Sequence, residues 1–386
     1  MSVPAFWLLR RHLTSVLCKV TKRYIVRVSK AWYSLASPFL FEYIFLGRGR
    51  VLGPLRDGML RSEQAVKSQE ILHTIGWQTQ RLDVHMRDRT DNPQLIMDIL
   101  ADILRRLPNL RVLTFAVVGH GYDSQYLPEN ILQATNPCRD TLRFLNWYGG
   151  LRPSSNTWAS FLENHPKLEA INAPVFLTKL ENSHIVLDSL KSVYIHCHPD
   201  PDLSATHIGD ELWNINFPNI HHAIYDITTT PSYFVHDDFL PKIGPKLTSI
   251  QINCLKNFYA IDDIHVAFFR ALIKIEATCT NLVRVDLLTH EWNLPLGLFP
   301  YCPKTVHTLG IRVHVHQIPK RSLRSLFTSL RNLLMITSLK TICFMDQDNV
   351  RALRSHPQAL SSQARILNEY GECGFNIVDH EGRSLL

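Results

Sequence analysis

The chain has 386 residues, of which 45% are hydrophobic and 19% are charged. That balance excludes an intrinsically disordered protein and allows either one large domain or two to three ordinary ones. The net charge of +7 is concentrated in residues 1–60, so the rest of the chain is close to neutral. A near-neutral body excludes the row of phosphate contacts that non-specific nucleic-acid binding needs, and we expect no nucleic-acid partner.

The 8 cysteines are scattered and form no C-x-x-C pair. This spacing is typical of buried free thiols in a reducing compartment, not of a disulfide framework or a zinc ribbon. No run of 18 apolar residues occurs, so we expect no membrane span. The apolar run 5–9 is stopped by Arg10 and Arg11, too early for a signal peptide. We therefore expect a cytoplasmic or nuclear protein, with a mitochondrial presequence as the open alternative because no acid precedes Glu42.

The first predicted element is a helix that begins near Val28 and ends at Pro38, which cannot continue it. Its apolar residues fall on one face: Val28, Trp32, Leu35 and Ala36. The stretch 47–75 opens with glycines and arginines and predicts a flexible linker. Arg48, Arg50 and Arg56 in this stretch are also candidates for phosphate contacts.

One apolar pattern recurs from residue 76 to residue 350: an apolar residue, two others, an apolar residue, one other, and a third apolar residue. After a weaker copy at Leu82 and Val84, nine copies have their central apolar residue at Leu113, Leu145, Ile171, Val193, Ala223, Ile250, Val285, Leu309 and Ile342. The steps between these central residues run from 22 to 35 residues. Each step accommodates a short strand, a turn and a helix.

The spacers between the copies have helical patterns. Asn92 and Pro93 predict a cap and a first-turn proline ahead of a one-faced apolar stripe from Leu95 to Leu107. A similar stripe runs from Ile264 to Ile275. In five copies a proline stands just before the first apolar residue, as in "LPNL" and "HPKL", and predicts that a helix stops there and a strand starts.

The repeats predict an α/β fold, an irregular leucine-rich-repeat solenoid of parallel strands plus helices, preceded by a short all-α segment. The alternative is a doubly wound α/β sheet, but no glycine-rich phosphate loop follows any of the predicted strands. The expected organisation is a helical segment over 1–46 that is either degenerate or truncated at its start, a linker over 47–75, repeats over 76–350, and a terminal cap or tail over 351–386.

Residues 28–44, "VSKAWYSLASPFLFEYI", resemble the second half of the F-box of fungal F-box and leucine-rich-repeat proteins. The residues that carry the resemblance are Val28, Lys30, Trp32, Leu35, Ala36, Pro38, Leu40 and Phe41. The resemblance implies that this segment docks on the Skp-type adaptor of a cullin-RING ubiquitin ligase, chiefly through Val28, Lys30, Trp32, Leu35, Pro38 and Leu40. It also implies that the repeats hold a substrate protein.

The residues between the apolar positions of each strand are expected to point to solvent on the concave side of the solenoid. They nominate a partner-binding face that is polar, mixed in sign and partly aromatic: Arg81, Asp83, Thr114, Asn146, Asn172, Tyr194, His222, Gln251, Arg284 and Asp286. An ordinary solvated surface is the alternative.

No catalytic or metal-binding constellation stands out in the sequence. The histidine pairs at 196 and 198, 221 and 222, and 314 and 316 lie in different repeats, and the acidic clusters at 236–238 and 346–348 are expected to be solvated loops. We therefore expect no enzyme and no cofactor. The leading hypothesis is a substrate-recognition subunit of a ubiquitin ligase, and the alternative is a leucine-rich-repeat scaffold with no ligase connection.

Overall fold

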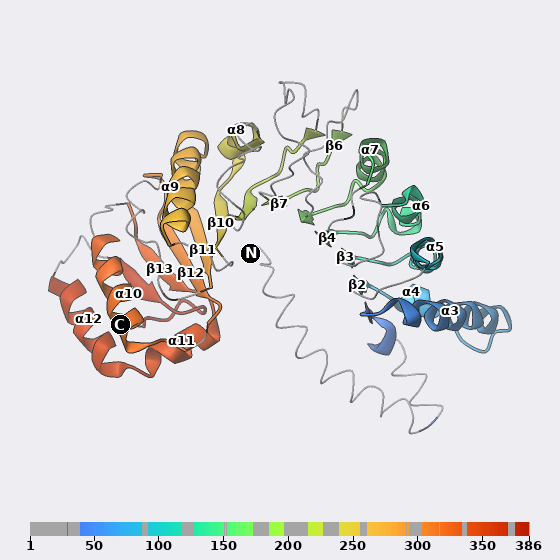
Figure 1. The fold of residues 1–386 in the computed structure, drawn as a ribbon, viewed down its shortest axis with the longest axis horizontal. Coiled ribbons are helices and arrows are strands. Elements are labelled where there is room, and N and C mark those ends of the chain that lie inside the picture. Colours follow the sequence, from blue (N-terminus) through green and yellow to red (C-terminus); the bar gives the residue numbers. More distant parts are fainter. Residues whose placement is uncertain are drawn as a thin grey trace. The chain divides into compact units, whose positions relative to one another are not determined.

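The computed structural model describes residues 29, 39–86, 92–117, 127–149, 151, 153–172, 185–196, 215–226, 239–254, 261–290, 292, 303–315, 317–333, 338–369 and 375–385. The chain forms two compact units. The first comprises Met1–Leu190 and Glu211–Pro218, and the second comprises Lys191–Asp210 and Asn219–Leu386. Both units consist of parallel strands and helices, as the repeat pattern predicted (Figure 1).

In the first unit, neighbouring strands of one parallel sheet follow chain order. They are β1 (Tyr43–Leu46), β2 (Arg81–Met86), β3 (Val112–Val117), β4 (Phe144–Gly149) and β5 (Ala170–Asn172). Two short strands, β6 (Ile185–Val186) and β8 (Ile215–Asn216), pair separately. The helices of this unit are η1 (Gly49–Val51), α3 (Leu52–Lys67), α4 (Ile75–Gln78), α5 (Pro93–Leu104), α6 (Glu129–Gln133), η2 (Asn136–Cys138) and α7 (Ser155–Asn164).

The second unit repeats the same plan, again with parallel strands in chain order. Its strands are β7 (Ser192–His196), β9 (His222–Asp226), β10 (Ser249–Cys254), β11 (Arg284–Thr289), β12 (Thr308–Val313), β13 (Thr341–Phe344) and β14 (Asn376–Val378). Its helices are α8 (Phe239–Ile243), η5 (Gly244–Lys246), α9 (Ile261–Thr278), α10 (Lys320–Asn332), α11 (Gln347–Arg354) and α12 (Pro357–Glu369).

The predicted central apolar residues form one continuous row in each unit. Strand register places Leu82 beside Leu113, Leu145 and Ile171 in the first unit. In the second, Val193, Ala223, Ile250, Val285, Leu309 and Ile342 stand side by side in the same way. Each of these side chains is at most 2% exposed. Burial of one such side chain per strand, repeated along the sheet, is the main source of stability of a stacked repeat.

The helices between the strands arise where the apolar stripes predicted them. Helix α5 starts at Pro93, and the Asn92 side chain accepts a hydrogen bond from the Leu95 backbone N–H at 3.0 Å, as expected of a cap. Helix α9 contains the second stripe. In the first unit, α3, α5, α6 and α7 pack in succession along one side of the sheet (Figure 1), so a rung in this part of the chain consists of a strand and a helical connection.

A backbone pattern aligns consecutive rungs where their strands begin. The N–H groups of Arg111 and Val112 both donate to the Gln80 carbonyl, and those of Arg143 and Phe144 both donate to the Arg111 carbonyl. The same paired donation recurs at His221/His222, Thr248/Ser249, Val283/Arg284, His307/Thr308 and Lys340/Thr341. Because each of these carbonyls accepts two N–H groups from the next rung, the backbone enters each of these strands in the same way.

Side chains reinforce this stacking four residues before the central apolar residue. Asn109 donates to the Trp77 carbonyl at 2.8 Å, and Thr141 donates to the Pro108 carbonyl at 2.9 Å. Asn281 donates to the Pro245 carbonyl at 2.7 Å. In each case the acceptor lies in the preceding rung, so one short polar side chain joins two rungs.

Glycine is required where the same turn passes close to the next rung. A Cβ added at Gly244 would lie 2.7 Å from the Thr278 carbonyl oxygen at the end of α9. One added at Gly76 would clash with the Arg106 carbonyl oxygen just after α5. Both glycines stand six residues before a central apolar residue, so the close approach is itself part of the repeat.

The expected linker over 47–75 is wrong. Residues 52–67 form helix α3, which packs on α5, and Leu52 and Met59 of this helix are buried. The glycines and arginines of this stretch suggested a flexible chain, but its apolar residues have a helical spacing that is sufficient to bury one face of a helix. Likewise, β1 pairs in parallel with β2, so the end of the expected 1–46 segment belongs to the repeat sheet.

The segment 351–386 continues the repeat beyond the expected boundary at 350. Helix α12 lies within it, and β14 pairs in parallel with β13, with Ile377 opposite Ile342. Among the nominated F-box-like residues, Val28, Lys30, Trp32, Leu35 and Pro38 lie outside the described residues. Leu40 is half-buried in a helical turn.

Candidate interaction face

The ten nominated face residues lie on the side of their strands opposite the buried row. They occupy two rows that the register defines. The first face row comprises the residues immediately before each central apolar residue, including Arg81, His222 and Arg284. The second comprises those immediately after it: Asp83, Thr114, Asn146 and Asn172 in the first unit, and Tyr194, Gln251 and Asp286 in the second.

The expectation that these side chains project into solvent is wrong for most of them. Asp83, Thr114, Asn146, His222, Gln251 and Asp286 are all buried, between 2% and 8% exposed. Arg81, Asn172, Tyr194 and Arg284 are half-buried. The alternation of a strand fixes the side on which a residue lies, but neighbouring strands are close enough for polar side chains to cover one another.

In the first unit, Asp83 is held by two donors. The Arg81 guanidinium donates to its carboxylate through Nε at 3.0 Å and Nη2 at 2.8 Å, and the Tyr43 hydroxyl donates to it at 2.7 Å. The Arg81 guanidinium also lies 5.0 Å from the centre of the Tyr43 ring. Burial, followed by the bond to Asp83, raises the pKa of the Tyr43 hydroxyl, which therefore stays protonated and donating. Arg81 and Tyr43 are thus fixed in one orientation.

The second unit contains a matching arrangement at the same two positions of a strand. The Arg284 Nε donates to the Asp286 carboxylate at 2.7 Å, and its Nη2 lies 3.3 Å from the Met345 sulfur. Gly310, opposite Asp286 on the next strand, leaves the space into which this carboxylate projects. Burial raises the pKa of Asp286, and the Arg284 charge opposes that rise.

The other nominated residues form shorter-range pairs. Gln251 donates to Asn253 at 2.6 Å along the same strand, and His222 Nδ1 lies 2.7 Å from the Ser249 hydroxyl on the neighbouring strand. Burial, and then the charges of His221 and Arg284, lowers the pKa of His222 to about 4. The face is therefore a network of mutually oriented polar groups, and orientation before binding reduces the entropy that a partner must remove.

Sequence reasoning missed Tyr43, Gly310 and Met345. Tyr43 precedes the apolar pair Ile44 and Leu46, a two-residue copy of the pattern that resembled many chance pairs. Gly310 lies within a clear copy at β12, between Leu309 and Ile311, and Met345 directly follows the copy at β13. Their part became visible only when the register placed them beside Asp286 and Arg284.

The described residues contain no group of three or more histidines, cysteines or acids that could hold a metal ion. Asp346, expected in a solvated loop, is instead 3% exposed and caps α11 by accepting from the Asp348 N–H at 2.8 Å. Cys138 and Cys279 are buried and free, and burial raises the pKa of their thiols to about 12 and about 11. Thiols in that state are poor nucleophiles.

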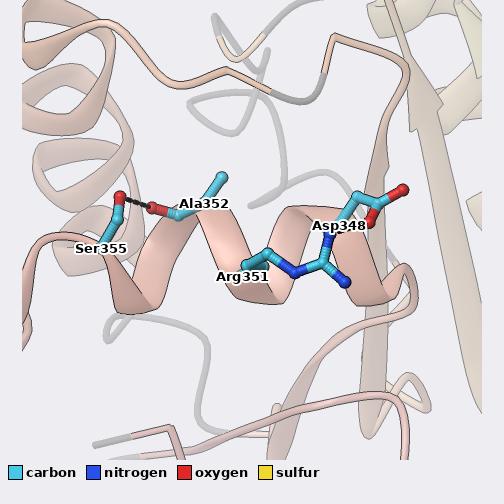
Figure 2. Close-up of a pocket in the computed structure, with 4 residues that line it drawn as sticks. All are labelled: Asp348, Arg351, Ala352 and Ser355. Atoms are coloured by element: carbon cyan, nitrogen blue, oxygen red, sulfur yellow. Dashed lines mark hydrogen bonds and ion pairs between the residues drawn. The ribbon is translucent and has the colours of Figure 1, made fainter.

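A surface hollow lies on the helical side of the second unit, on α11 (Figure 2). Asp348, Arg351, Ala352 and Ser355 line it. Arg351 pairs with Asp348 at 2.8 Å, and the Ser355 hydroxyl donates to the Ala352 carbonyl at 2.7 Å. These bonds are exposed pairs within one helix, so the hollow offers a ligand little beyond an ordinary helix surface. Across the described residues, no helix is long and apolar enough to cross a bilayer.

No family model matches the chain, and no curated protein matches it. Among solved structures, the chain is similar to the crystal structure of a Bacteroides fragilis protein determined by a structural-genomics consortium. The two are 12% identical, with 79% of this chain and 76% of that chain covered and a TM-score of 0.33. At this TM-score the likeness assigns neither fold nor function to the chain.

Proposed function

We propose that the rungs are irregular leucine-rich repeats and that the chain is the substrate-recognition subunit of a Skp-cullin-F-box ubiquitin ligase. One observation carries the proposal: the F-box-like residues 28–44 run directly into β1, the first strand of a parallel repeat sheet. In this arrangement the adaptor-docking segment and the partner-binding face belong to one continuous stretch of chain, without the flexible linker that the sequence predicted.

The oriented polar face supports the second half of the proposal. Arg81 and Tyr43 are held by Asp83, and Arg284 is held by Asp286, so these side chains present donors and aromatic surface at little entropic cost. Arginine and tyrosine are enriched among the residues that dominate the energy of protein interfaces. We assign the substrate protein to this face, which includes Tyr43, and the Skp-type adaptor to residues 28–40.

The adaptor half is tested by co-purification with a Skp-type adaptor. Trp32→Ala removes the largest apolar side chain of the F-box-like segment, and Trp77→Ala removes a tryptophan that is 49% exposed outside it. We expect the unaltered chain and Trp77→Ala to retain the adaptor, and Trp32→Ala to lose at least tenfold of it, because buried aromatic anchors dominate helix docking. Failure of the unaltered chain to retain any adaptor would contradict the ligase role.

The second candidate is a repeat scaffold without a ligase connection. It is favoured by the absence, before Val28, of the L-P-x-E-[IL] sequence with which the family's F-box opens. Immunoprecipitation followed by an in vitro ubiquitination reaction separates the two candidates. Partners that become ubiquitinated only in the presence of this protein support the ligase, whereas stable partners that stay unmodified support the scaffold.

A further inference from the structure

The edge of the second unit where its strands begin has an unusual charge pattern. We call the two residues before each central apolar residue the strand-start edge. It comprises Lys191/Ser192, His221/His222, Thr248/Ser249, Val283/Arg284, His307/Thr308, Lys340/Thr341 and Phe375/Asn376. None of these residues is acidic, and several are cationic or imidazole side chains. In the first unit, the corresponding positions include Arg81, Arg111 and Arg143 but also the acids Glu42 and Glu169.

Backbone hydrogen bonds align these residues rung by rung. The Lys191 carbonyl accepts from the N–H groups of His221 and His222, and the same step repeats up to Asn376, whose N–H donates to the Lys340 carbonyl. Each residue of the edge therefore stands beside its counterpart on the next strand, about 4.8 Å away. The side chains form a regular row and not a loose collection of surface groups.

The row is accessible and locally electropositive. Thr248 and Lys340 are exposed, and the Arg284 side chain is 39% exposed. Burial is the main cause that lowers the pKa of His222 to about 4, and the neighbouring charges of His221 and Arg284 add to that shift. Asp286, an acid in the adjacent second face row, is buried and paired with Arg284.

Two histidines of the row have the same orientation. His221 Nδ1 lies 3.2 Å from the Asn219 carbonyl oxygen, and His307 Nδ1 bonds the Thr305 carbonyl oxygen. Because a carbonyl can only accept, Nδ1 carries the proton in both rings and Nε2 is left for another partner.

We propose that the strand-start edge of the second unit binds an extended, acidic segment of a partner protein that runs across the strands. The row from His221 on β9 to Lys340 on β13 crosses four strand spacings, about 19 Å, which an extended chain covers with about six residues at ~3.3 Å each. Carboxylates at intervals along such a segment meet Arg284 and Lys340, and the hydroxyls of Thr248, Ser249 and Thr308 and the His307 Nε2 are available to its other polar groups.

The composition of the row fits a peptide better than a nucleic acid. From β9 to β13 only Arg284 and Lys340 are permanent cations, and hydroxyl and imidazole groups separate them. Phosphate backbones are bound by denser lysine and arginine contacts, several per helical turn. This inference rests on the proposed partner-binding role but not on the ligase connection.

The test measures fluorescence anisotropy of a labelled peptide of about eight residues, alternating glutamate and serine, on the full chain at low ionic strength. The glutamine counterpart and a single-stranded RNA serve as further probes. The test variant is Thr248→Glu with Lys340→Glu on the edge. Its matched control is Arg324→Glu with Thr328→Glu, two exposed residues of α10 on the helical side. Both variants change the net charge equally.

We expect the glutamate peptide to bind, the glutamine peptide to bind at least tenfold more weakly, and the edge variant to lose at least tenfold affinity while the α10 variant changes less than twofold. If the edge variant fails to fold, Lys340→Gln alone should weaken binding about threefold. Absence of binding, equal losses in both variants, or tighter binding of the RNA would overturn the proposal. Adaptor retention by the edge variant, measured in parallel, keeps this outcome separate from the fate of the ligase role.

Discussion

His222 combines burial with a position in the electropositive row, and this predicts a pH-dependent stability. Its pKa is about 4 in the folded chain, against an ordinary value near 6.5 in an unfolded one. Between these values the unfolded chain binds a proton that the folded chain does not, so stability falls as pH falls from 6.5 to 4. The pKa shift corresponds to a loss of roughly 3 kcal/mol in the free energy of unfolding when the pH has fallen to 4.

Urea unfolding of the unaltered chain and of His222→Gln at pH 7.5 and pH 4.5 measures this contribution. We expect the loss of stability at pH 4.5 to be smaller in the variant, because glutamine does not titrate. Asp379, whose pKa is lowered to about 2, takes up a proton only in the unfolded chain as pH falls below about 5, so it adds a small loss of stability that is the same in both proteins. An identical loss in both proteins would show that His222 is not the titrating group.

At the scale of the element, the turn before each strand joins neighbouring rungs through one side chain. Asn281→Ala removes the bond from the Asn281 amide to the Pro245 carbonyl, and we expect a loss of about 0.5–1.5 kcal/mol in the free energy of unfolding. Asn281→Thr should recover part of that loss, because Thr141 makes the corresponding bond with its hydroxyl. Thermal denaturation of both variants checks the prediction.

Asn156→Ala on α7 is the matched control, since Asn156 is exposed and lies in a helix that alanine favours. The midpoint of thermal denaturation of Asn156→Ala should stay the same as that of the unaltered chain or rise slightly. If Asn281→Thr were no better than Asn281→Ala, the side chain would stabilise the turn by a route other than the bond between rungs.

The elements that the sequence predicted and those that it missed differ in how many apolar residues mark them. The strands β3 to β13 on the main sheets were predicted where three apolar residues coincide, as at Leu110, Leu113 and Phe115. In β1 only Ile44 and Leu46 face the interior, and β14 has Ile377 at the central position. A short strand buries too few side chains to distinguish its pattern from chance, although pairing with a neighbour stabilises it.

The sequence predicted on which side of the strands the candidate face lies, but not that most of its side chains are buried. Alternation along a strand placed Asp83 and Asp286 on the correct side, because side chains of successive residues point to opposite faces. Their burial depends on Tyr43 and Gly310, which lie on other strands far away in the chain. Such contacts follow from register, and register is set by the whole stack.

At the scale of the whole molecule, the C-terminal residues protect the last strand of the second unit. After β14 the chain turns back, so that Leu385 N–H donates to the Ile377 carbonyl and Ser384 pairs with Val378. Asp379 holds this turn: it accepts from the N–H groups of Glu381 and Arg383, both at 2.9 Å, and pairs with Arg354 and Arg383. Burial would raise the pKa of Asp379, but these N–H groups and the Arg383 charge lower it to about 2.

This arrangement predicts that the C-terminal turn prevents self-association. Deletion of residues 375–386 leaves β13 with unpaired backbone groups, and an exposed strand edge is a template for pairing with another chain. We expect the shortened chain to form higher-order species that grow with concentration in size-exclusion chromatography with light scattering.

Asp379→Ala keeps the strand but frees the turn. It should lower the free energy of unfolding by about 1.5–3 kcal/mol, because charge-assisted bonds are lost, and it should associate less than the deletion. Asp348→Ala is the matched control, because Asp348 also forms an ion pair with an arginine, Arg351, but is exposed on α11. This variant should have nearly the same stability and association as the unaltered chain. If the shortened chain stayed as dispersed as the full one, protection of the β13 edge would have to come from elsewhere in the second unit.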